Sequence, residues 1–510
     1  MKPKTTTKNK KNNKLKFILS SIIAFICGAI LTLAFAPFHI WVIAFISLIV
    51  LFYLWSGAKT GKYAFYLGYL FGLGNFGTGI SWVYVSIHTY GNTSTPLAVF
   101  ITLLFIMVLS LFPAIVGFLN QKLCSKEKNS YQLCFIYPAT WTLFEWIRSW
   151  IFTGFPWLFV GYTQTDTYLG GLAEAGSVYL VSFAVCLCAS ALIMFVRTKR
   201  NSARCIAIVI IIVLWALGWF FLQDQQWTIK KGKPLSVSLI QGNIKPTTKW
   251  DPEHLKYIQK TYLDLTEKHP ADLIFWPENS IPNFPMYVAP YVKNLNQFAI
   301  NHNSAILLGM PLGNPYGKYY NGAIVVGYGY GEYKKQHLVP FGEYLPLRSI
   351  FLPIMTWMNQ PMSEFTEGPA DQGTVTMQNM DVALFICYEI AFPSLVRKDA
   401  QTANLIATIT DDGWFGKTIA PWQHLQITHM RSIELGKSII QATNDGITAI
   451  ITPNKVITYP PFKRGVLEGT VYAMKGQTPW VRYGMTPVLM LIFLSLILGL
   501  VIRRRQKEVN

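Results

Sequence analysis

The sequence predicts a polytopic α-helical membrane bundle of about eight spans, joined to a soluble domain of layered strands and helices. Two observations carry this prediction. Hydrophobic residues make up 52% of the 510 residues and the mean hydropathy is +0.31, values that argue against a purely soluble protein. In addition, residues 235–475 form one long soluble block between stretches that are apolar enough to cross a bilayer.

The candidate membrane spans are apolar stretches of roughly 20 residues, the length that crosses a bilayer core. They cover residues 17–36, 40–55, 63–87, 96–119, 135–152, 168–196, 205–222 and 483–502. The second is short and charge interrupts the fifth, so eight is an approximate count. Ala34-Phe35-Ala36 looks like a signal-peptide cleavage site, but the polytopic chain that follows favours an uncleaved first span.

Lysine and arginine residues lie at every second connection between these spans. Seven lysines stand in residues 1–16, and residues 503–510 hold three arginines and a lysine. The intervening connections at 88–95 and 162–168 hold neither residue type. By the positive-inside rule both termini are expected in the cytoplasm, and seven crossings place the soluble block on the outer side.

The expected domain organisation follows from these spans. It comprises a basic cytoplasmic tail (1–16), a seven-span bundle (17–223), the outer block (235–475), a final span (483–502) and a second basic tail (503–510). Cytoplasmic tails and loops that face anionic headgroups account for much of the formal net charge of +19, so nucleic acid is not an expected partner.

The soluble block combines strand-like and helical patterns. Residues 254–269 and 421–437 have helical periodicity. Runs rich in β-branched and aromatic residues predict strands at 236–240, 272–276, 305–310, 323–328, 382–387, 405–410, 438–442 and 448–451. Apolar strands interspersed with helices indicate an α/β domain whose sheets are covered by helices. The soluble block has no Walker loop, GxGxxG turn or metal-spaced His/Cys cluster, so neither a cofactor nor a metal is expected.

Cys387 is the only cysteine in this block, so it cannot form a disulfide within its own domain. Nucleophilic acyl transfer needs a thiolate, a base that generates it, and positive charge where an oxyanion forms. Cys387, Glu278 and Lys335 offer these three groups at the ends of strand-like runs, and Glu343 could orient Lys335 or relay protons. Each residue alone also fits a structural role, Cys387 as core packing and the charged groups as solvated strand ends or turns.

Three runs around these residues resemble the Glu, Lys and Cys motifs of the carbon-nitrogen hydrolase (nitrilase) superfamily. They are Trp276-Pro277-Glu278, Lys335-Gln336-His337-Leu338 and Cys387-Tyr388-Glu389. Together with the membrane spans, nearly the whole chain resembles the bacterial apolipoprotein N-acyltransferase family. Further runs that carry this resemblance are Gln241-Gly242-Asn243-Ile244 with Lys249-Trp250, Leu338-Val339-Pro340-Phe341-Gly342-Glu343, Trp414-Phe415-Gly416 with Pro421-Trp422-Gln423-His424, and Glu145-Trp146 with Arg148 and Thr153-Gly154-Phe155-Pro156-Trp157.

The resemblance implies a four-layer α-β-β-α sandwich on the periplasmic face of a multi-pass bundle in the bacterial inner membrane. It implies the last step of lipoprotein maturation, in which a phospholipid acyl chain passes through a Cys387 thioester to the amine of a diacylglyceryl-cysteine at an apolipoprotein N-terminus. Glu278 would act as the base and Lys335 would hold the oxyanion. Supporting roles are implied for Glu343, Tyr388 and Glu389, and contacts with substrate or lipid for Trp250 and Trp414.

One position departs from the family's usual pattern. Asp411 stands where the family more often has Asn before the Asp-x-Trp-Phe-Gly run, so Asp411 is not included in the expected site. We expect the chain to act as a monomer.

Several apolar or charged features have two possible roles. The stretches 281–292 and 345–358 either pack on the domain's own core or dip into the outer leaflet, with Phe351 and Trp357 as candidate lipid contacts. Glu145 and Arg148 lie three residues apart in the fifth span. They either form a structural pair or leave Arg148 free to hold a phospholipid headgroup.

Two other functions are compatible with the same residues. A membrane-tethered amidase or nitrilase would hydrolyse a small amide with the same three groups, and a transporter or scaffold would carry an inactive copy of the domain. The apolar stretches and the seven preceding spans favour transfer over hydrolysis. Because all three catalytic residue types are present, the scaffold is disfavoured. The sequence therefore predicts an acyltransferase that works in two steps through a thioacyl-enzyme.

Overall fold

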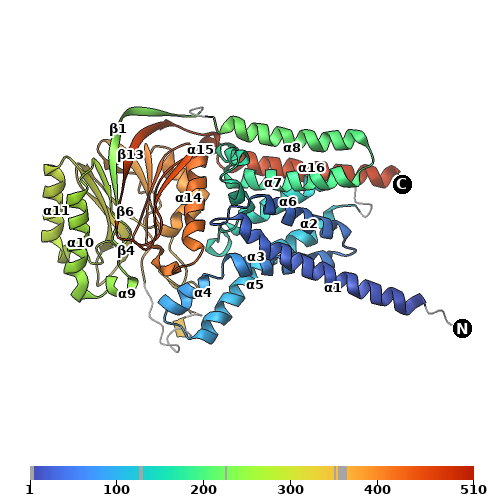
Figure 1. Ribbon diagram of the computed structural model, residues 1–510, viewed down its shortest axis with the longest axis horizontal. Helices are drawn as coiled ribbons and strands as arrows, with labels where there is room; N and C mark the ends of the chain where they lie inside the picture. The colour runs from blue at the N-terminus through green and yellow to red at the C-terminus, as the bar shows by residue number, and fades with distance from the viewer. Residues whose placement is uncertain (1–4, 126–129, 224–226, 350–351, 354–363, 510) are drawn as a thin grey trace.

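The computed structural model describes residues 5–125, 130–223, 227–349, 352–353 and 364–509. Two parts stand end to end along the long axis of the molecule: a bundle of long helices and a domain of stacked sheets covered by helices (Figure 1). The expected combination of a helical membrane bundle with an α-β-β-α sandwich is confirmed.

Each expected span coincides largely with one helix. These helices are α1 (Thr5–Leu31), α2 (Val42–Gly57), α3 (Gly61–Gly79), α5 (Thr95–Leu123), α6 (Ser130–Arg148), α7 (Ala173–Arg197), α8 (Asn201–Phe221) and α16 (Thr486–Val509). Within the described residues, five helical segments are long and apolar enough to cross a membrane by themselves, namely those that contain α1, α5, α7, α8 and α16. α1 begins inside the stretch that we expected as a basic tail, and α2 is the short span.

Close packing explains how the glycine-rich α3 is accommodated in the bundle. A Cβ atom on Gly68 would come within 2.3 Å of the Pro113 carbonyl oxygen, and one on Gly72 within 2.7 Å of the Ser110 Cα. Small residues let two membrane helices approach this closely, and the resulting van der Waals contact stabilises helix pairs in lipid. α3 is therefore held by its contact with α5 as well as by its apolar character.

The beginning of α1 and the end of α16 lie at the same end of the bundle, and the sheet domain lies at the opposite end (Figure 1). α8 leads directly into the first strand of the sheet domain, and the last strand leads back toward α16. The sheet domain is thus inserted between two neighbouring parts of the bundle.

The sheet domain contains two sheets. The first has the order β13-β1-β2-β3-β4-β6, formed by β1 (Thr228–Gln241), β2 (Leu273–Phe275), β3 (Ala305–Gly313), β4 (Tyr319–Gly327), β6 (Glu332–Lys334) and β13 (Gly465–Gly476). The second has the order β12-β11-β10-β9-β8-β7-β5, formed by β5 (Gly329–Tyr330), β7 (Val375–Met377), β8 (Met380–Ile386), β9 (Leu405–Thr410), β10 (Ile439–Thr443), β11 (Thr448–Thr452) and β12 (Lys455–Tyr459).

Every expected strand is present, but the sequence patterns missed the short strands β5, β6 and β7, the edge strand β12 and the long edge strand β13. This strand pairs antiparallel with most of β1 at the edge of the first sheet. Its burial is irregular because glycine, Glu468 and Lys475 interrupt the apolar positions. An edge strand with one solvated face lacks the continuous apolar run that identified the central strands.

Apolar cores separate the four layers. The two sheets pack face to face through fully buried residues such as Leu239, Leu307 and Ala407. α10 (Leu255–Lys268) and α11 (Ala289–Asn301) cover the outer face of the first sheet. α13 (Pro393–Ala400) and α14 (Ala420–Leu435) cover the second sheet on the side of the bundle (Figure 1).

The structure describes the apolar stretch 281–292 in full but only part of the stretch 345–358. In 281–292, Ile281 and Val288 are buried in the core beneath α10 and α11, whereas Met286 and Tyr287 are exposed. This stretch leads into α11, in the layer farthest from the bundle, which favours the core alternative for its buried residues (Figure 1). Of 345–358, residues 350–351 and 354–358 lie outside the described residues, and so do the two candidate lipid contacts Phe351 and Trp357.

α14 joins the sheet domain to the bundle, and nearly all of its side chains are buried. The Gln423 Oε1 accepts hydrogen bonds from the indole N–H groups of Trp82, at 3.1 Å, and Trp157, at 2.7 Å. Farther along the helix, the Glu434 Oε1 accepts from the Ser177 hydroxyl and the Val178 N–H, at a break in α7. A carboxylate of the sheet domain thereby caps the start of a helical segment in the bundle.

Candidate active site

The candidate site lies where strands of both sheets end. β1, β2 and β3 are parallel neighbours in one sheet, and β8, β9 and β10 are parallel neighbours in the other. Glu278 follows β2, Cys387 directly follows β8, and Asp411 directly follows β9. Since the carboxyl ends of parallel strands meet at one edge of a sheet, residues that are distant in sequence converge there.

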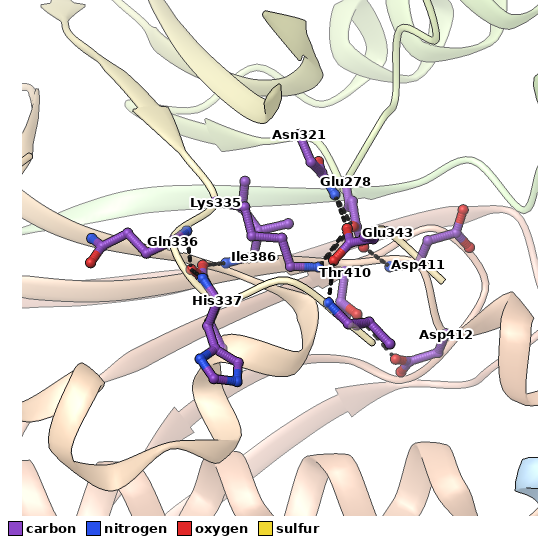
Figure 2. A network of polar contacts seen from close by, with 12 residues as sticks. Glu278, Asn321, Lys335, Gln336, His337, Glu343, Ile386, Thr410, Asp411 and Asp412 are labelled. Carbon is purple, nitrogen blue, oxygen red and sulfur yellow. Dashed lines mark hydrogen bonds and ion pairs between the residues drawn. The ribbon is translucent and has the colours of Figure 1, made fainter. Parts of the chain in front are cut away.

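Glu278, Lys335 and Glu343 form one buried polar network (Figure 2). The Lys335 Nζ lies 2.9 Å from the Glu343 Oε1 and 3.7 Å from the Glu278 Oε1. Asn321, on β4, joins the two carboxylates, because its Nδ2 donates to the Glu278 Oε1 and to the Glu343 Oε1, each at 2.7 Å. The backbone N–H of Asp411 donates to the Glu278 Oε2 at 2.9 Å. Both oxygens of Glu278 are therefore held in fixed directions.

Burial sets the protonation behaviour of this network. Burial raises the pKa of the Glu278 carboxyl, and the Lys335 ammonium opposes that rise. For Lys335, burial would lower the pKa, but the Glu343 and Glu278 carboxylates outweigh it and hold the pKa above its ordinary value. A carboxyl group with raised proton affinity thus stands beside an ammonium group whose positive charge the two carboxylates favour.

Cys387 stands at a strained turn between β8 and a short 3₁₀ helix. Its φ of +56° is in the left-handed region, which L-residues other than glycine seldom adopt and which recurs at active sites. Burial raises the pKa of its thiol well above the ordinary value, Glu278 raises it further, and Lys335 lowers it. The thiol is therefore protonated at rest and needs a base to become a nucleophile.

Glu389 connects the two loops that carry Lys335 and Cys387. Its Oε1 accepts from the backbone N–H groups of Gln336 at 2.6 Å and His337 at 3.0 Å, and its Oε2 accepts from that of Ile386 at 2.7 Å. Burial raises the pKa of Glu389 to about 7, against the effect of these three N–H donors. The geometry identifies Glu389 as a residue that positions the neighbouring loops.

Sequence reasoning missed Lys249, Asp411 and Asn321. Lys249 is buried, and its Nζ pairs with the Asp411 Oδ2 and donates to the Glu278 carbonyl oxygen at 3.2 Å. Asp411, excluded from the expected site, touches Glu278 through its backbone and Lys249 through its side chain. Two signals pointed to these residues: Lys249 lies in a run that carried the resemblance, and Asp411 directly follows a predicted strand.

Tyr388 and Trp414 face the bundle. The Tyr388 hydroxyl donates to the Gly154 carbonyl oxygen at 3.0 Å. The Trp414 carbonyl oxygen accepts from the Ser86 hydroxyl at 2.8 Å, and the Trp414 ring lies edge-on to Tyr90 with ring centres 5.6 Å apart. Trp250 is exposed at the end of α9 (Pro246–Lys249), next to Lys249. The site is thus bordered by aromatic residues that meet the bundle on one side.

Of the two roles left open for Glu145 and Arg148, the structural pair is not formed, because no ion pair joins them among the described residues. The Glu145 Oε1 accepts instead from the Trp141 indole and from the Val160 N–H. The Arg148 guanidinium donates to the Trp157 carbonyl oxygen at 2.7 Å and lies over the Phe76 and Phe159 rings. Each group thus has partners other than the opposite charge, although the Glu145 Oε2 is buried without a hydrogen-bond partner. Arg148 holds the segment that follows α6.

No group of three His, Cys, Asp or Glu side chains in the described parts of the chain is arranged to hold a metal ion. The groups that surround Cys387 can accept a proton and stabilise negative charge, which are the requirements of nucleophilic acyl chemistry.

Comparison with known proteins identifies both parts of the chain. Residues 236–474 match the carbon-nitrogen hydrolase family model, so the sheet domain is a carbon-nitrogen hydrolase domain carried on a membrane bundle. Residues 27–191 match the apolipoprotein N-acyltransferase N-terminal domain. The chain belongs to the apolipoprotein N-acyltransferase family.

Relatives of nearly full length support this assignment. The apolipoprotein N-acyltransferase of Azotobacter vinelandii is 38% identical over 499 residues, which cover 96% of each chain. That of Coxiella burnetii is 40% identical over 484 residues, 94% of this chain and 99% of the relative. Among solved structures, an amidase from Nesterenkonia sp. AN1 aligns with a TM-score of 0.35 and 17% identity over 50% of this chain and 95% of the amidase.

Proposed function

We propose that this protein transfers an acyl chain from a membrane phospholipid, through a thioester on Cys387, to the N-terminal amine of a diacylglyceryl-cysteine on an apolipoprotein. The observation that carries the proposal is the buried Glu278–Lys335–Glu343 network beside the only cysteine of the sheet domain, in a chain of the apolipoprotein N-acyltransferase family. Carboxylate, ammonium and thiol are the three groups that thioester chemistry needs.

In the first half-reaction the Glu278 carboxylate accepts the Cys387 thiol proton, and the thiolate attacks the ester carbonyl carbon of the phospholipid. The Lys335 ammonium stabilises the negative charge that develops on the carbonyl oxygen. The C–O bond then breaks, Glu278 returns the proton to the departing oxygen, and lysophospholipid leaves. Glu343 and Asn321 keep Lys335 and Glu278 in place.

In the second half-reaction the amine of the acceptor attacks the thioester carbonyl carbon while Glu278 accepts a proton from nitrogen. The C–S bond breaks, an amide forms, and the proton on Glu278 returns to the Cys387 thiolate. The enzyme regains its starting state, so one set of residues serves both halves of a ping-pong cycle.

The arrangement of the two parts fits a multi-pass protein of the bacterial inner membrane. The ends of α1 and α16 that lie far from the sheet domain adjoin the lysine- and arginine-rich termini. By the positive-inside rule we place both termini in the cytoplasm and the sheet domain in the periplasm. Contacts of Trp250, Trp414 and Arg148 with lipid or substrate, and action as a monomer, remain predictions.

The test is intact mass spectrometry of the purified protein after incubation with one defined phospholipid. We expect an acyl-sized mass increase in the wild type that a diacylglyceryl peptide removes, and no increase in Cys387→Ala. Cys205→Ala is the matched control, because Cys205 is an exposed cysteine of α8 and should not affect the adduct. An unchanged mass with turnover of a small amide would instead establish a tethered hydrolase.

A further inference from the structure

Behind Glu278, on the side away from Lys335, the structure holds a second charged cluster that the proposed reaction does not use. It consists of Lys249 from α9, Asp411 from the end of β9 and Asp445 from the end of β10. All three side chains are at least nine-tenths buried, with exposed fractions of 1%, 5% and 5%. Buried charges of this kind are costly unless they are paired.

The cluster holds Glu278 at two points. The Lys249 Nζ donates to the Glu278 carbonyl oxygen at 3.2 Å, and the Asp411 N–H donates to the Glu278 Oε2 at 2.9 Å. Lys249 and Asp411 also pair directly with each other. The main chain and the carboxylate of Glu278 are therefore fastened to the same ion pair.

The carboxyl groups of Asp411 and Asp445 both lie beside Gly413. Two ionised carboxylates so placed repel each other, and the charge of Asp411 raises the pKa of the Asp445 carboxyl. A Cβ atom on Gly413 would meet oxygens of both carboxyl groups, at 3.2 Å from Asp411 and 2.5 Å from Asp445. Lys249 supplies a single positive charge, so neutrality of the three groups requires that one of the two carboxyls stays protonated.

We propose that Lys249, Asp411 and Asp445 are a positioning unit for Glu278, in which Asp445 donates a shared proton to Asp411 and Lys249 neutralises the charge that remains. This inference rests on the proposed function insofar as Glu278 is the base. The unit gives the base a fixed orientation without adding net charge behind it.

Burial raises the pKa of Asp445 to about 9, and the negative charge of Asp411 adds to that effect. Because this pKa is raised above the unfolded value, the stability that the shared proton contributes is lost as pH rises through about 9. The titratable or charged groups that face the two carboxyls are Lys249 from α9, Glu278 from the loop after β2, Asp412 from the same turn, Tyr262 from α10 and Tyr90 from the bundle.

The test uses full-length protein in lipid nanodiscs and two measurements. The first is the rate at which iodoacetamide labels Cys387 as a function of pH, followed by peptide mass spectrometry. The second is the thermal unfolding midpoint. Labelling needs no acyl donor, so these measurements stay informative even if the wild type forms no acyl adduct, an outcome that would contradict only the transferase function.

Each variant has a distinct expected result. Asp445→Asn should match the wild type at neutral pH, because an amide replaces a protonated carboxyl, and should lack the loss of stability near pH 9.

Lys249→Met should lower the unfolding midpoint. It should also move the pH below which the labelling rate falls upward by about one pH unit, since a positive charge beside Glu278 is removed. The double variant Asp411→Asn/Asp445→Asn should lose more stability than the two single changes combined, because Lys249 is left buried without a carboxylate.

The combination Lys249→Met/Asp411→Asn keeps the test decisive if Lys249→Met fails to fold. Removal of both charges should restore folded protein, whereas no recovery would overturn the shared-charge arrangement. Two other results would also overturn it. One is a loss of stability in Asp445→Asn as large as that in Lys249→Met, and the other is an unchanged labelling profile in folded Lys249→Met.

Discussion

The Asn321 amide lowers the proton affinity of the proposed base, which burial raises. Its Nδ2 donates to Glu278 and to Glu343 at once, so a single amide group keeps two buried carboxylates from separating. Such a hydrogen bond favours the ionised form of Glu278 and lowers the pKa that burial has raised. Asn321 lies on β4, outside the three motifs that carry the proposed catalytic residues.

Asn321→Ala should shift the pH dependence of acyl-enzyme formation. Glu278 must be ionised to accept the thiol proton, so the rate falls as pH drops through its pKa. Loss of the amide donor raises that pKa further, and the acid limb should move upward by about one pH unit. The measurement is the rate of the acyl mass adduct as a function of pH, with the exposed Asn301→Ala as control. An acid limb that coincides with the wild type would refute this role.

At the scale of elements, two loops must stay in register for the site to work. One follows β6 and carries Lys335, and the other follows β8 and carries Cys387. Neither loop is part of a regular hydrogen-bonded ladder where they meet. Glu389, on the loop after β8, supplies the missing connection. Its Oε1 accepts two backbone N–H groups from the loop after β6, and its Oε2 accepts that of Ile386 at the end of β8.

Glu389→Gln should separate the two loops and lower the rate of acyl-enzyme formation on the order of 100-fold. A glutamine side chain has only one oxygen, so its amide N–H groups would face backbone donors that the carboxylate accepts. Single-turnover mass spectrometry measures the effect, and the exposed Glu253→Gln serves as control. A rate close to that of the wild type would show that the carboxylate does not hold the loops.

For the whole molecule, the decisive contact is the one between α14 and the bundle. Arg431 and Glu434 form a fully buried ion pair on this helix, with the Arg431 Nη2 2.8 Å from the Glu434 Oε1. The same Glu434 oxygen caps the second segment of α7, and the Arg431 Nη2 donates to the Tyr162 hydroxyl at 3.2 Å. The sheet domain is therefore fixed to the membrane part by groups that cannot be hydrated where they lie.

Glu434→Ala should destabilise the protein by about 3–5 kcal/mol, because Arg431 and two donors near the start of an α7 segment lose their acceptor in a buried place. Thermal unfolding in detergent measures the loss. The ion pair between the half-buried Lys334 and the exposed Glu332 provides the control, and Glu332→Ala should cost less than about 1 kcal/mol. The coupling is tested with Arg431→Met, Glu434→Met and the double variant. If the double variant loses as much stability as the two single variants added together, the residues are not coupled.

Much of the architecture could be predicted from the sequence because it depends on local patterns. Hydropathy located the spans, and continuous apolar runs located the central strands. The strand ends and motif runs singled out Glu278, Lys335 and Cys387, and the structure brings the strand ends that carry them to one edge of the sandwich. The sequence missed β5, β6 and β7 because they are only two or three residues long, and β12 and β13 because half-solvated edge strands have a weak pattern. Phe351 and Trp357 lie outside the described residues.

By itself the sequence determined the two-part architecture, the spans and the chemical groups that a thioester mechanism needs. Only the tertiary structure decided which groups touch one another. Lys249 and Asp411 pair across 162 residues of chain, Glu389 connects loops that lie more than 50 residues apart, and Arg148 binds backbone carbonyls instead of Glu145. Periodicity reports the environment of each residue along the chain, whereas pairing between buried charges depends on which strand ends the fold brings together.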